Sequence, residues 1–152
     1  MVRLKPNTSY IEISQAIILK ENLYLMQLRD FKPNIIYPGH WGFFAGHWKN
    51  NETAKEAMMR ELLEELCWQP KSLVYLGNLF GEWNHHIHVH KCQLDGSLES
   101  LTLKEGQEIG AFTVDEIIQN SLFSYKWKQY YPITPISAKI FQHFIKDIID
   151  WK

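Results

Sequence analysis

The segment TAKEAMMRELLEEL, residues 53–66, constrains the fold most, because its periodicity is that of one amphipathic helix. Thr53 and Glu56 form a T-x-x-E capping box that places the helix start near residue 53. Pro70 stops any continuation beyond about Leu66. At roughly 100° per residue, one side of this helix is apolar and is expected to pack on a sheet; it carries Met59, Leu62, Leu63 and Leu66.

The rest of the chain contains mainly short strand-like segments separated by turn residues. We predict strands at 10–19, 23–28, 41–44, 72–80, 84–94 and 109–114, and a short strand or extended segment at 98–103. A second capping box, Thr113 with Glu116, predicts a short helix over 115–120, and the C-terminal residues from 135 form an amphipathic helix. This order indicates an α+β fold in one domain, residues 1–152, with helices packed on a mixed sheet.

Composition narrows the class of protein. Lys plus Arg number 16 and Asp plus Glu 17, so the net charge of −1 argues against nucleic acid as a partner. Two cysteines, Cys67 and Cys92, make no disulfide framework, and the first ten residues contain no apolar signal region. No apolar run is long enough to span a bilayer. We expect a cytoplasmic protein that does not associate with membranes.

Three carboxylates, Glu61, Glu64 and Glu65, share an arc of about 100° on the predicted helix, flanked by the small residues Ala54 and Ala57. On an exposed helix such a cluster costs only about 0.2–0.5 kcal/mol per like-charged pair. In a cleft, carboxylates ~5 Å apart repel by about 3 kcal/mol, so they take up protons or bind cations. Oxygen ligands suit Mg²⁺ or Mn²⁺. Spacing alone leaves the solvated face and the metal site equally open.

The residues upstream separate these two interpretations. The segment 46–68 resembles the Nudix box, G-x5-E-x7-R-E-U-x-E-E-x-G-U with U aliphatic, and seven positions match: Gly46, Glu52, Arg60, Glu61, Leu62, Glu64 and Glu65. The order of strands and helices is also similar to that of the Nudix fold along nearly the whole chain. The resemblance implies a Nudix-type α/β/α sandwich.

The chain departs from the Nudix pattern at several positions. Cys67 replaces the glycine that normally ends the helix in a left-handed conformation, and Trp68 replaces an aliphatic residue. Cysteine in that conformation costs about 1 kcal/mol, unless the turn takes another form. Ala45 stands where the family has a glycine before Gly46. Asn51 can replace a loop glycine, because Asn tolerates left-handed backbone. No carboxylate is lost.

The resemblance implies hydrolysis of a nucleoside diphosphate linked to a group X, assisted by Mg²⁺ or Mn²⁺. Glu61, Glu64 and Glu65 are the implied metal ligands, together with the carbonyl of Ala45. Arg60 and Glu52 are expected to form an ion pair that fixes the loop against the helix.

The base that activates water varies within the family. Glu61 is the first candidate, Glu105 in the loop "KEGQE" the second, and Glu108 the third. A plain polar turn is an equally weighted interpretation of that loop. Arg29 ends the second predicted strand, where related proteins often contact phosphate, although a surface arginine fits the sequence equally well.

The run "NHHIHVHK" places His86, His88 and His90 on one face of a strand, and His85, Ile87 and Val89 on the other. We expect the three histidines to line or border the substrate cleft, with His88 in contact with substrate. A zinc site needs a closed ligand set, and the two cysteines are not spaced for one, so we expect no zinc site on this strand. Tryptophans near the predicted cleft stack a base or pack in the core; they are Trp41, Trp48 and Trp83, of which Trp83 is assigned to substrate binding.

Family markers for ADP-ribose or diadenosine polyphosphates are missing from residues 83–87, "WNHHI". The small size resembles enzymes that act on nucleoside triphosphates, oxidised or not, and some that act on sugar nucleotides. A non-catalytic Nudix-like module that binds or senses nucleotides is the alternative, supported only by Cys67 and the altered loop. A homodimer is left open.

Overall fold

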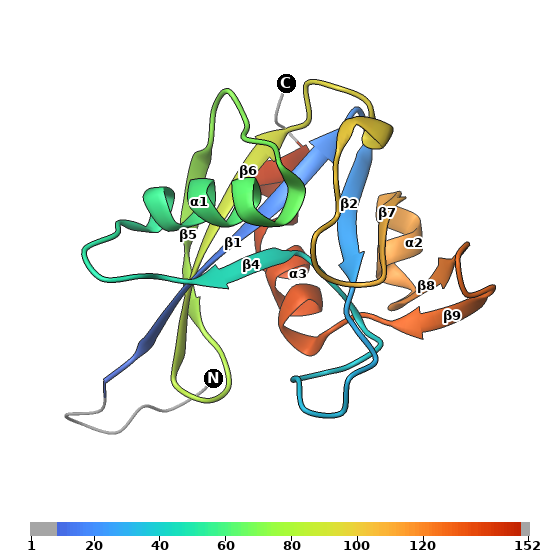
Figure 1. Ribbon diagram of the computed structural model, residues 1–152, viewed down its shortest axis with the longest axis horizontal. Helices are drawn as coiled ribbons and strands as arrows, with labels where there is room; N and C mark the ends of the chain where they lie inside the picture. Colours follow the sequence, from blue (N-terminus) through green and yellow to red (C-terminus); the bar gives the residue numbers. More distant parts are fainter. Residues whose placement is uncertain (1–8, 150–152) are drawn as a thin grey trace.

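The computed structural model describes residues 9–149, and its backbone forms a mixed sheet between helices (Figure 1). The α+β sandwich predicted from the sequence is confirmed. The strands are β1 (Ile11–Lys20), β2 (Leu23–Leu28), β3 (Trp41–Gly42), β4 (Phe44–His47), β5 (Val74–Phe80), β6 (His85–Gln93), β7 (Glu108–Phe112), β8 (Ser121–Ser124) and β9 (Gln129–Pro132). The helices are α1 (Ala54–Leu66), the 3₁₀ turn η1 (Leu98–Ser100), α2 (Val114–Ile118) and α3 (Pro135–Ile149).

β1 is the central strand of the seven-stranded sheet. β6 pairs with it in parallel along nearly its whole length, and β5 continues the sheet antiparallel to β6. On its other edge β1 pairs with β4 over its first half and with β2 over its second half, both antiparallel. β2 also pairs with β3 and β7. Because β4 pairs with this edge of β1, it lies directly beside α1, the helix that follows β4 in the chain.

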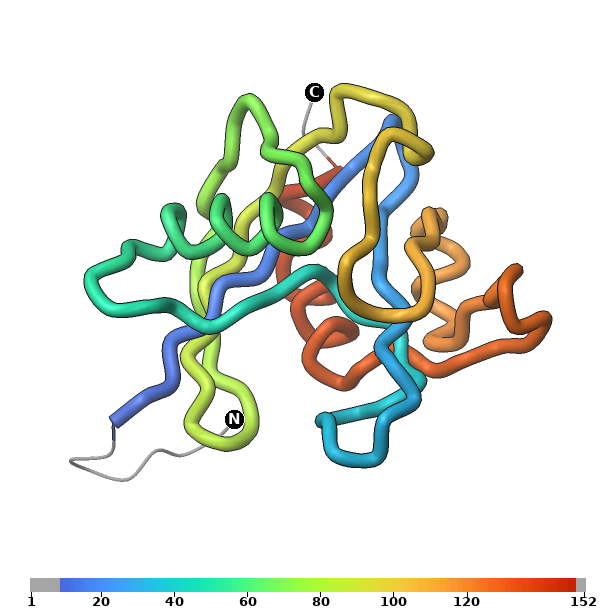
Figure 2. Tube along the Cα trace, viewed as in Figure 1, coloured from blue at the N-terminus to red at the C-terminus, as the bar shows by residue number. Residues whose placement is uncertain are grey.

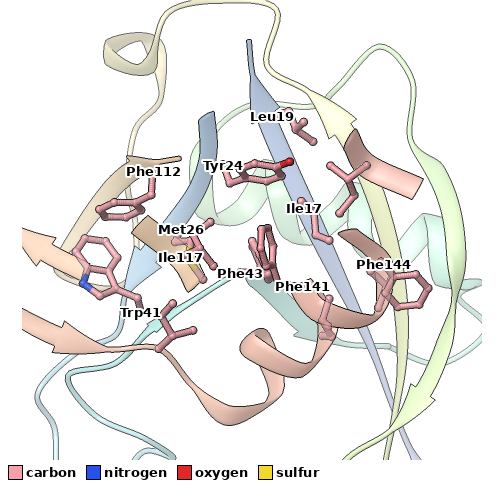
Figure 3. Close-up of a cluster of buried hydrophobic side chains, with 14 of the residues drawn as sticks. Ile17, Leu19, Tyr24, Met26, Trp41, Phe43, Phe112, Ile117, Phe141 and Phe144 are labelled. Atoms are coloured by element: carbon pink, nitrogen blue, oxygen red, sulfur yellow. The ribbon is translucent and has the colours of Figure 1, made fainter. Parts of the chain in front are cut away.

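Two apolar cores lie on opposite faces of the sheet, because successive side chains of β1 alternate between them. On one face, Ile17 and Leu19 pack with Phe141 and Phe144 of α3 and with Ile117 of α2 (Figure 3). On the other, Ile18 packs with α1 through Met58, Leu62 and Leu66. Figures 1 and 2 show α1 on the near side of the sheet and α3 behind it. Each fully buried side chain of this size contributes roughly 1.5–3 kcal/mol.

The buried side of α1 differs from the prediction. Leu63 is 51% exposed, whereas Ala57 is fully buried and Glu65 is only 9% exposed. The helix rests on β4 as well as β1. The carboxylate side is therefore turned partly toward the sheet, and Ala57 packs in the interface instead of leaving open space.

Two other expectations need correction, and one element was missed. The predicted strand at 41–44 is divided into β3 and β4. The segment 98–103 begins with η1, because the Ser100 hydroxyl closes a turn on the Ser97 carbonyl at 2.6 Å while Leu101 packs in the α1-side core. The hairpin of β8 and β9 was not predicted. Across residues 9–149, no helix is long and apolar enough to cross a membrane.

Candidate active site

The loop before α1 is fixed by a two-pronged ion pair. Arg60 donates from Nε to Glu52 Oε2 at 2.6 Å and from Nη2 to Glu52 Oε1 at 3.0 Å. Nη2 also donates to the His47 carbonyl at 2.8 Å. The hydrogen bond from Arg60 lowers the pKa of Glu52 to about 2. Asn51, at φ 67°, takes the left-handed conformation that a glycine would otherwise supply.

Both ends of α1 have local reasons to lie where they do. The Thr53 hydroxyl accepts from the Glu56 backbone N–H at 3.2 Å, and Glu56 Oε1 accepts from the Thr53 N–H at 2.9 Å. Cys67 ends the helix at φ 54° and ψ 37°, and its N–H donates to the Leu63 carbonyl at 3.0 Å. The cysteine therefore adopts the strained left-handed geometry that the motif gives to glycine.

Glu61 lies directly against β4. A side chain at Gly46 would place its Cβ 2.1 Å from the Glu61 carboxyl carbon, so only glycine leaves room for this carboxylate. Arg60 Nη1 donates to Glu61 at 2.9 Å and to Glu64 at 3.2 Å, and Lys49 lies 3.6 Å from Glu64. Two of the three carboxylates thus have cationic neighbours.

Glu65 differs from them. Its Oε2 atom is buried and has no hydrogen-bond partner among the described residues. Burial raises its pKa to about 8, and the negative charges of Glu61 and Glu105 add to this effect. A buried, unpartnered carboxylate oxygen beside other carboxylates is a site where a hard divalent cation fits, since it would supply the missing partner and cancel the repulsion.

The loop 104–107 brings Glu105 to the same place. The Lys104 N–H donates to the Glu65 carbonyl at 2.8 Å, the Gln107 N–H to the Leu28 carbonyl at 2.8 Å, and Gln27 Nε2 to the Glu105 carbonyl at 2.5 Å. The Glu105 carboxylate lies close enough to Glu65 to add to the rise in the pKa of Glu65. Glu108 lies elsewhere, because its carboxylate accepts from the Ser124 hydroxyl at 2.5 Å and from the Tyr125 N–H at 3.2 Å.

A cleft with a volume of about 200 Å³ lies beside the carboxylates of α1. Ala45 and Gly46 form the part of its wall nearest to them. The loop after β2 and the β5–β6 turn, which project from the same end of the molecule in Figure 1, both contribute to its walls. Arg29 and Gln27 line both this cleft and a smaller hollow that contains Glu105. Arg29 Nε donates to the Ile36 carbonyl at 2.8 Å, and desolvation lowers its pKa against the opposing influence of Glu105 and Glu65.

The three tryptophans have different surroundings. Trp83 is 54% exposed and lines the cleft; it occupies the β5–β6 turn with Asn84, both at positive φ, as a type I′ turn requires. Trp41 is fully buried and donates from Nε1 to the Leu122 carbonyl at 3.0 Å. Trp48 packs on the ring of His88 with 4.8 Å between ring centroids.

The alternation predicted for β6 holds, but the cleft lies on the other face of the strand. His85 and Ile87 line it, with Ile87 part of the α3-side core. The structure does not place His88 in the cleft: its Nε2 lies 2.8 Å from Glu12 on the α1 side. The expectation reversed the two faces because the polar face of β6 was taken as the ligand face, whereas the cleft opens at the edge of the apolar one.

Several cleft residues were missed from the sequence. Gln15 and Gln27 are buried polar side chains beside apolar residues of β1 and β2, and a glutamine in such a run is the signal that can reveal them. The Gln15 Oε1 atom has no partner within residues 9–149, so it is available to a ligand. Tyr37, Glu82 and His85 come from turns and a strand end, where no sequence pattern marked them.

Solved structures share this fold. The E. coli ORF135 protein aligns at TM-score 0.69 with 23% identity over 95% of this chain and 94% of that one. A MutT protein from Methanosarcina mazei aligns at 0.70 with 17% identity over 95% and 99%. The NUDIX domain of Shewanella oneidensis NrtR, complexed with ADP ribose, aligns at 0.69 with 11% identity over 95% and 94%.

Comparison with curated proteins gave no significant match. The family model described as the NUDIX domain matches residues 14–135, a span that contains Glu52, Glu61, Glu64, Glu65 and Glu105. The motif residues, their placement around α1 and this match agree, and the chain belongs to the Nudix family.

Proposed function

We propose that this protein is a metal-dependent Nudix hydrolase that cleaves the diphosphate linkage of a nucleoside diphosphate joined to a group X. The buried, unpartnered Oε2 of Glu65, next to Glu61 and Glu105, carries the proposal. An acidic group that merely coated a surface would have no reason to be desolvated. A non-catalytic binding module would not need a buried, unpartnered carboxylate either.

The residues that would hold a divalent cation are Glu61, Glu64 and Glu65, with the carbonyl of Ala45. All are oxygen donors, which suit Mg²⁺ or Mn²⁺. When bound, such a cation neutralises charge on the diphosphate and makes water a better nucleophile. Gly46 contributes by leaving room for Glu61, and the Arg60–Glu52 pair holds the loop and helix in register.

Side chains of the protein would assist the hydrolysis itself. A water molecule attacks phosphorus, its proton passes to a carboxylate, and the bond from phosphorus to the leaving phosphate oxygen breaks. Glu61 is the first candidate for the base and Glu105 the second, since both lie beside Glu65. Arg29, which faces the cleft and the hollow with Glu105, is placed to bind a phosphate oxygen.

The cleft suits the nucleoside part of a small substrate. Trp83 and Tyr37 provide exposed or partly exposed aromatic surface, and Gln15 provides an unpartnered amide oxygen. A nucleoside triphosphate, oxidised or not, or a sugar nucleotide matches this size. The ADP ribose bound by the NrtR NUDIX domain is a ligand of the same chemical class, which supports the assignment to nucleoside diphosphate derivatives.

A panel of nucleoside triphosphates, oxidised triphosphates and sugar nucleotides, tested with Mg²⁺ and scored by phosphate release after phosphatase treatment, decides the question. We expect turnover of at least one member and its loss in excess EDTA. Rates that persist in EDTA contradict the metal requirement. Binding without turnover across the panel, measured by calorimetry, favours the sensor alternative.

A further inference from the structure

A second group of metal-ligating side chains lies on the α1 side of the sheet, on β1 and β6. His86 Nδ1 lies 2.9 and 3.0 Å from the two carboxylate oxygens of Glu12, and His88 Nε2 lies 2.8 Å from Glu12 Oε1. The three potential ligand atoms are all within 4.8 Å of one another. This is a two-histidine, one-carboxylate set that does not involve Glu61, Glu64 or Glu65.

The strands hold this group in place. β1 and β6 are parallel, and Glu12 is the direct register partner of His86, while His88 is paired with Ser14, two residues along β1. The three side chains therefore project from neighbouring positions on one face of a paired ladder. Phe80 stacks on the His86 ring at 4.5 Å and Trp48 packs on the His88 ring at 4.8 Å, which restricts both rings.

The outward nitrogen of each imidazole has its own partner. His86 Nε2 lies 3.1 Å from Asn78 Oδ1, and His88 Nδ1 lies 3.0 Å from the Tyr75 hydroxyl. Asn78 in turn donates to the Tyr75 oxygen at 3.3 Å. Metal-binding histidines are held in this way, since a hydrogen bond at one nitrogen leaves the lone pair of the other free.

With the outward nitrogens occupied, the inward nitrogens of both imidazoles point at the Glu12 carboxylate at hydrogen-bond distance. That arrangement repels unless a proton or a cation lies between them. We propose that Glu12, His86 and His88 bind one divalent transition-metal ion of the zinc class. Imidazole nitrogens select such ions over Mg²⁺, and three protein ligands leave a fourth position for water.

The dimensions agree with this assignment. Metal–ligand bonds of about 2.0–2.1 Å at tetrahedral angles place ligand atoms roughly 3.3 Å apart. The observed nitrogen–oxygen separations of 2.8–3.0 Å lie within a few tenths of an ångström of this spacing, and the Glu12 side chain is 30% exposed. The sequence run lacked a closing ligand; Glu12 supplies it from the first strand.

The site would stabilise the approach to α1 from the sheet side. The Trp48 N–H donates to the Glu12 carbonyl at 3.1 Å, and Trp48 Nε1 donates to the Ser14 hydroxyl at 2.9 Å. Ser14 in turn donates to the Ala54 carbonyl at the start of α1, at 2.7 Å. An ion bound between β1 and β6 would thus be connected through Glu12 to Trp48, which opens the loop before α1. This role is structural and separate from hydrolysis.

Calorimetric titration of metal-free protein with Zn²⁺, in excess Mg²⁺ to occupy the carboxylates of α1, tests the proposal. We expect one Zn²⁺ per chain. Glu12→Gln and His88→Gln should weaken the affinity by more than about 100-fold, and Asn78→Ala by about 10–100-fold, as for loss of a partner of a ligand. His143→Gln, the same change on an exposed face of α3, is the matched control and should bind normally.

Thermal unfolding gives a second readout, because a ligand that binds only the folded state raises its Tm. Zn²⁺ should raise the Tm of the wild type and of His143→Gln, and leave that of Glu12→Gln unchanged. Failure of the wild type to bind stoichiometric Zn²⁺ overturns the proposal, even if a variant of Glu12, His86 or His88 fails to fold. So does full affinity in folded Glu12→Gln, or loss of the zinc in Glu65→Gln.

Discussion

The carboxylates of α1 and the group of Glu12, His86 and His88 lie on the same side of the sheet but are built in opposite ways. The first set comes from one helical turn, with Glu105 added by a loop. The second joins strands whose residues are 74 positions apart in the sequence. Helical spacing alone brings side chains at i and i+4 together, whereas strand neighbours depend on register. Local chemistry was therefore visible in the sequence, and the strand site was not.

The two groups also differ in charge. Arg60 pairs with Glu61 and Glu64, but Glu65 remains buried with an unpartnered oxygen. Glu12, in contrast, lies 2.8–2.9 Å from the nitrogens of two imidazoles. The helix group carries excess negative charge and oxygen ligands only, which favours Mg²⁺ or Mn²⁺; the strand group carries nitrogen ligands, which favour zinc-class ions.

Glu65→Gln should produce the largest effect and separate the two groups. The amide keeps the shape of the side chain but removes a charged oxygen ligand, so turnover with Mg²⁺ should fall by more than about 100-fold. The Zn²⁺ affinity of the strand group should not change. Steady-state kinetics on the best substrate of the panel measures the first, and calorimetry the second. Glu99→Gln, an exposed site in η1, is the control; undiminished turnover in Glu65→Gln would refute the assignment of this group as the active one.

Arg60→Lys should produce the next largest effect. Lysine keeps the positive charge. It cannot donate two parallel hydrogen bonds to Glu52 and also donate one to the His47 carbonyl. The loop and Glu61 should shift, and a misplacement of this kind lowers turnover by about 10–100-fold. Kinetics combined with circular dichroism checks this outcome. A variant that retains both wild-type kinetics and Tm would show that charge alone holds the loop.

The pH dependence of stability tests the charge difference. The folded-state pKa of Glu65, about 8, lies above that of an unfolded glutamate, so the folded state binds the extra proton between pH 4.5 and 8. The free energy of unfolding of metal-free protein should therefore fall by a few kcal/mol as pH rises through this window. Urea unfolding in EDTA at several pH values measures it.

Two comparisons make that measurement specific to Glu65. Glu65→Gln should flatten the dependence in this window, because an amide has no proton to release. Excess Mg²⁺ should have the same effect on the wild type, since a cation favours the ionised form. An identical slope in wild type and Glu65→Gln would assign the dependence to other groups.

Cys67→Gly should have the smallest effect. Removing the Cβ relieves the left-handed strain at φ 54°, and the greater freedom of glycine in the unfolded chain offsets part of the gain. The net stabilisation should be at most about 1 kcal/mol, with turnover within a few-fold of the wild type. Cys67→Ala, which keeps the Cβ, is the control and should show no gain. Loss of activity in folded Cys67→Ser would instead point to a covalent role for the thiol.

The sequence by itself determined the features that depend on neighbours within one turn or one strand. The capping box at Thr53 follows from local backbone chemistry and occurs in the structure. The pair of Arg60 with Glu52 and the left-handed residues Asn51 and Cys67 were expected from the resemblance to the Nudix box, and they occur too. The same locality made the shared face of the α1 carboxylates visible. The layered α+β arrangement followed from alternating strand and helix patterns.

Only the tertiary structure decided which surfaces meet. The packing of α1 on β1 and β4 buries Ala57 and Glu65 and leaves Leu63 exposed, and the missing side chain of Gly46 leaves room for Glu61. The parallel register of β1 and β6 puts Glu12 beside His86. A one-residue change in that register would move Glu12 to the opposite face. Register and layer contacts join residues far apart in the chain, and periodicity carries no information about which distant segments become neighbours.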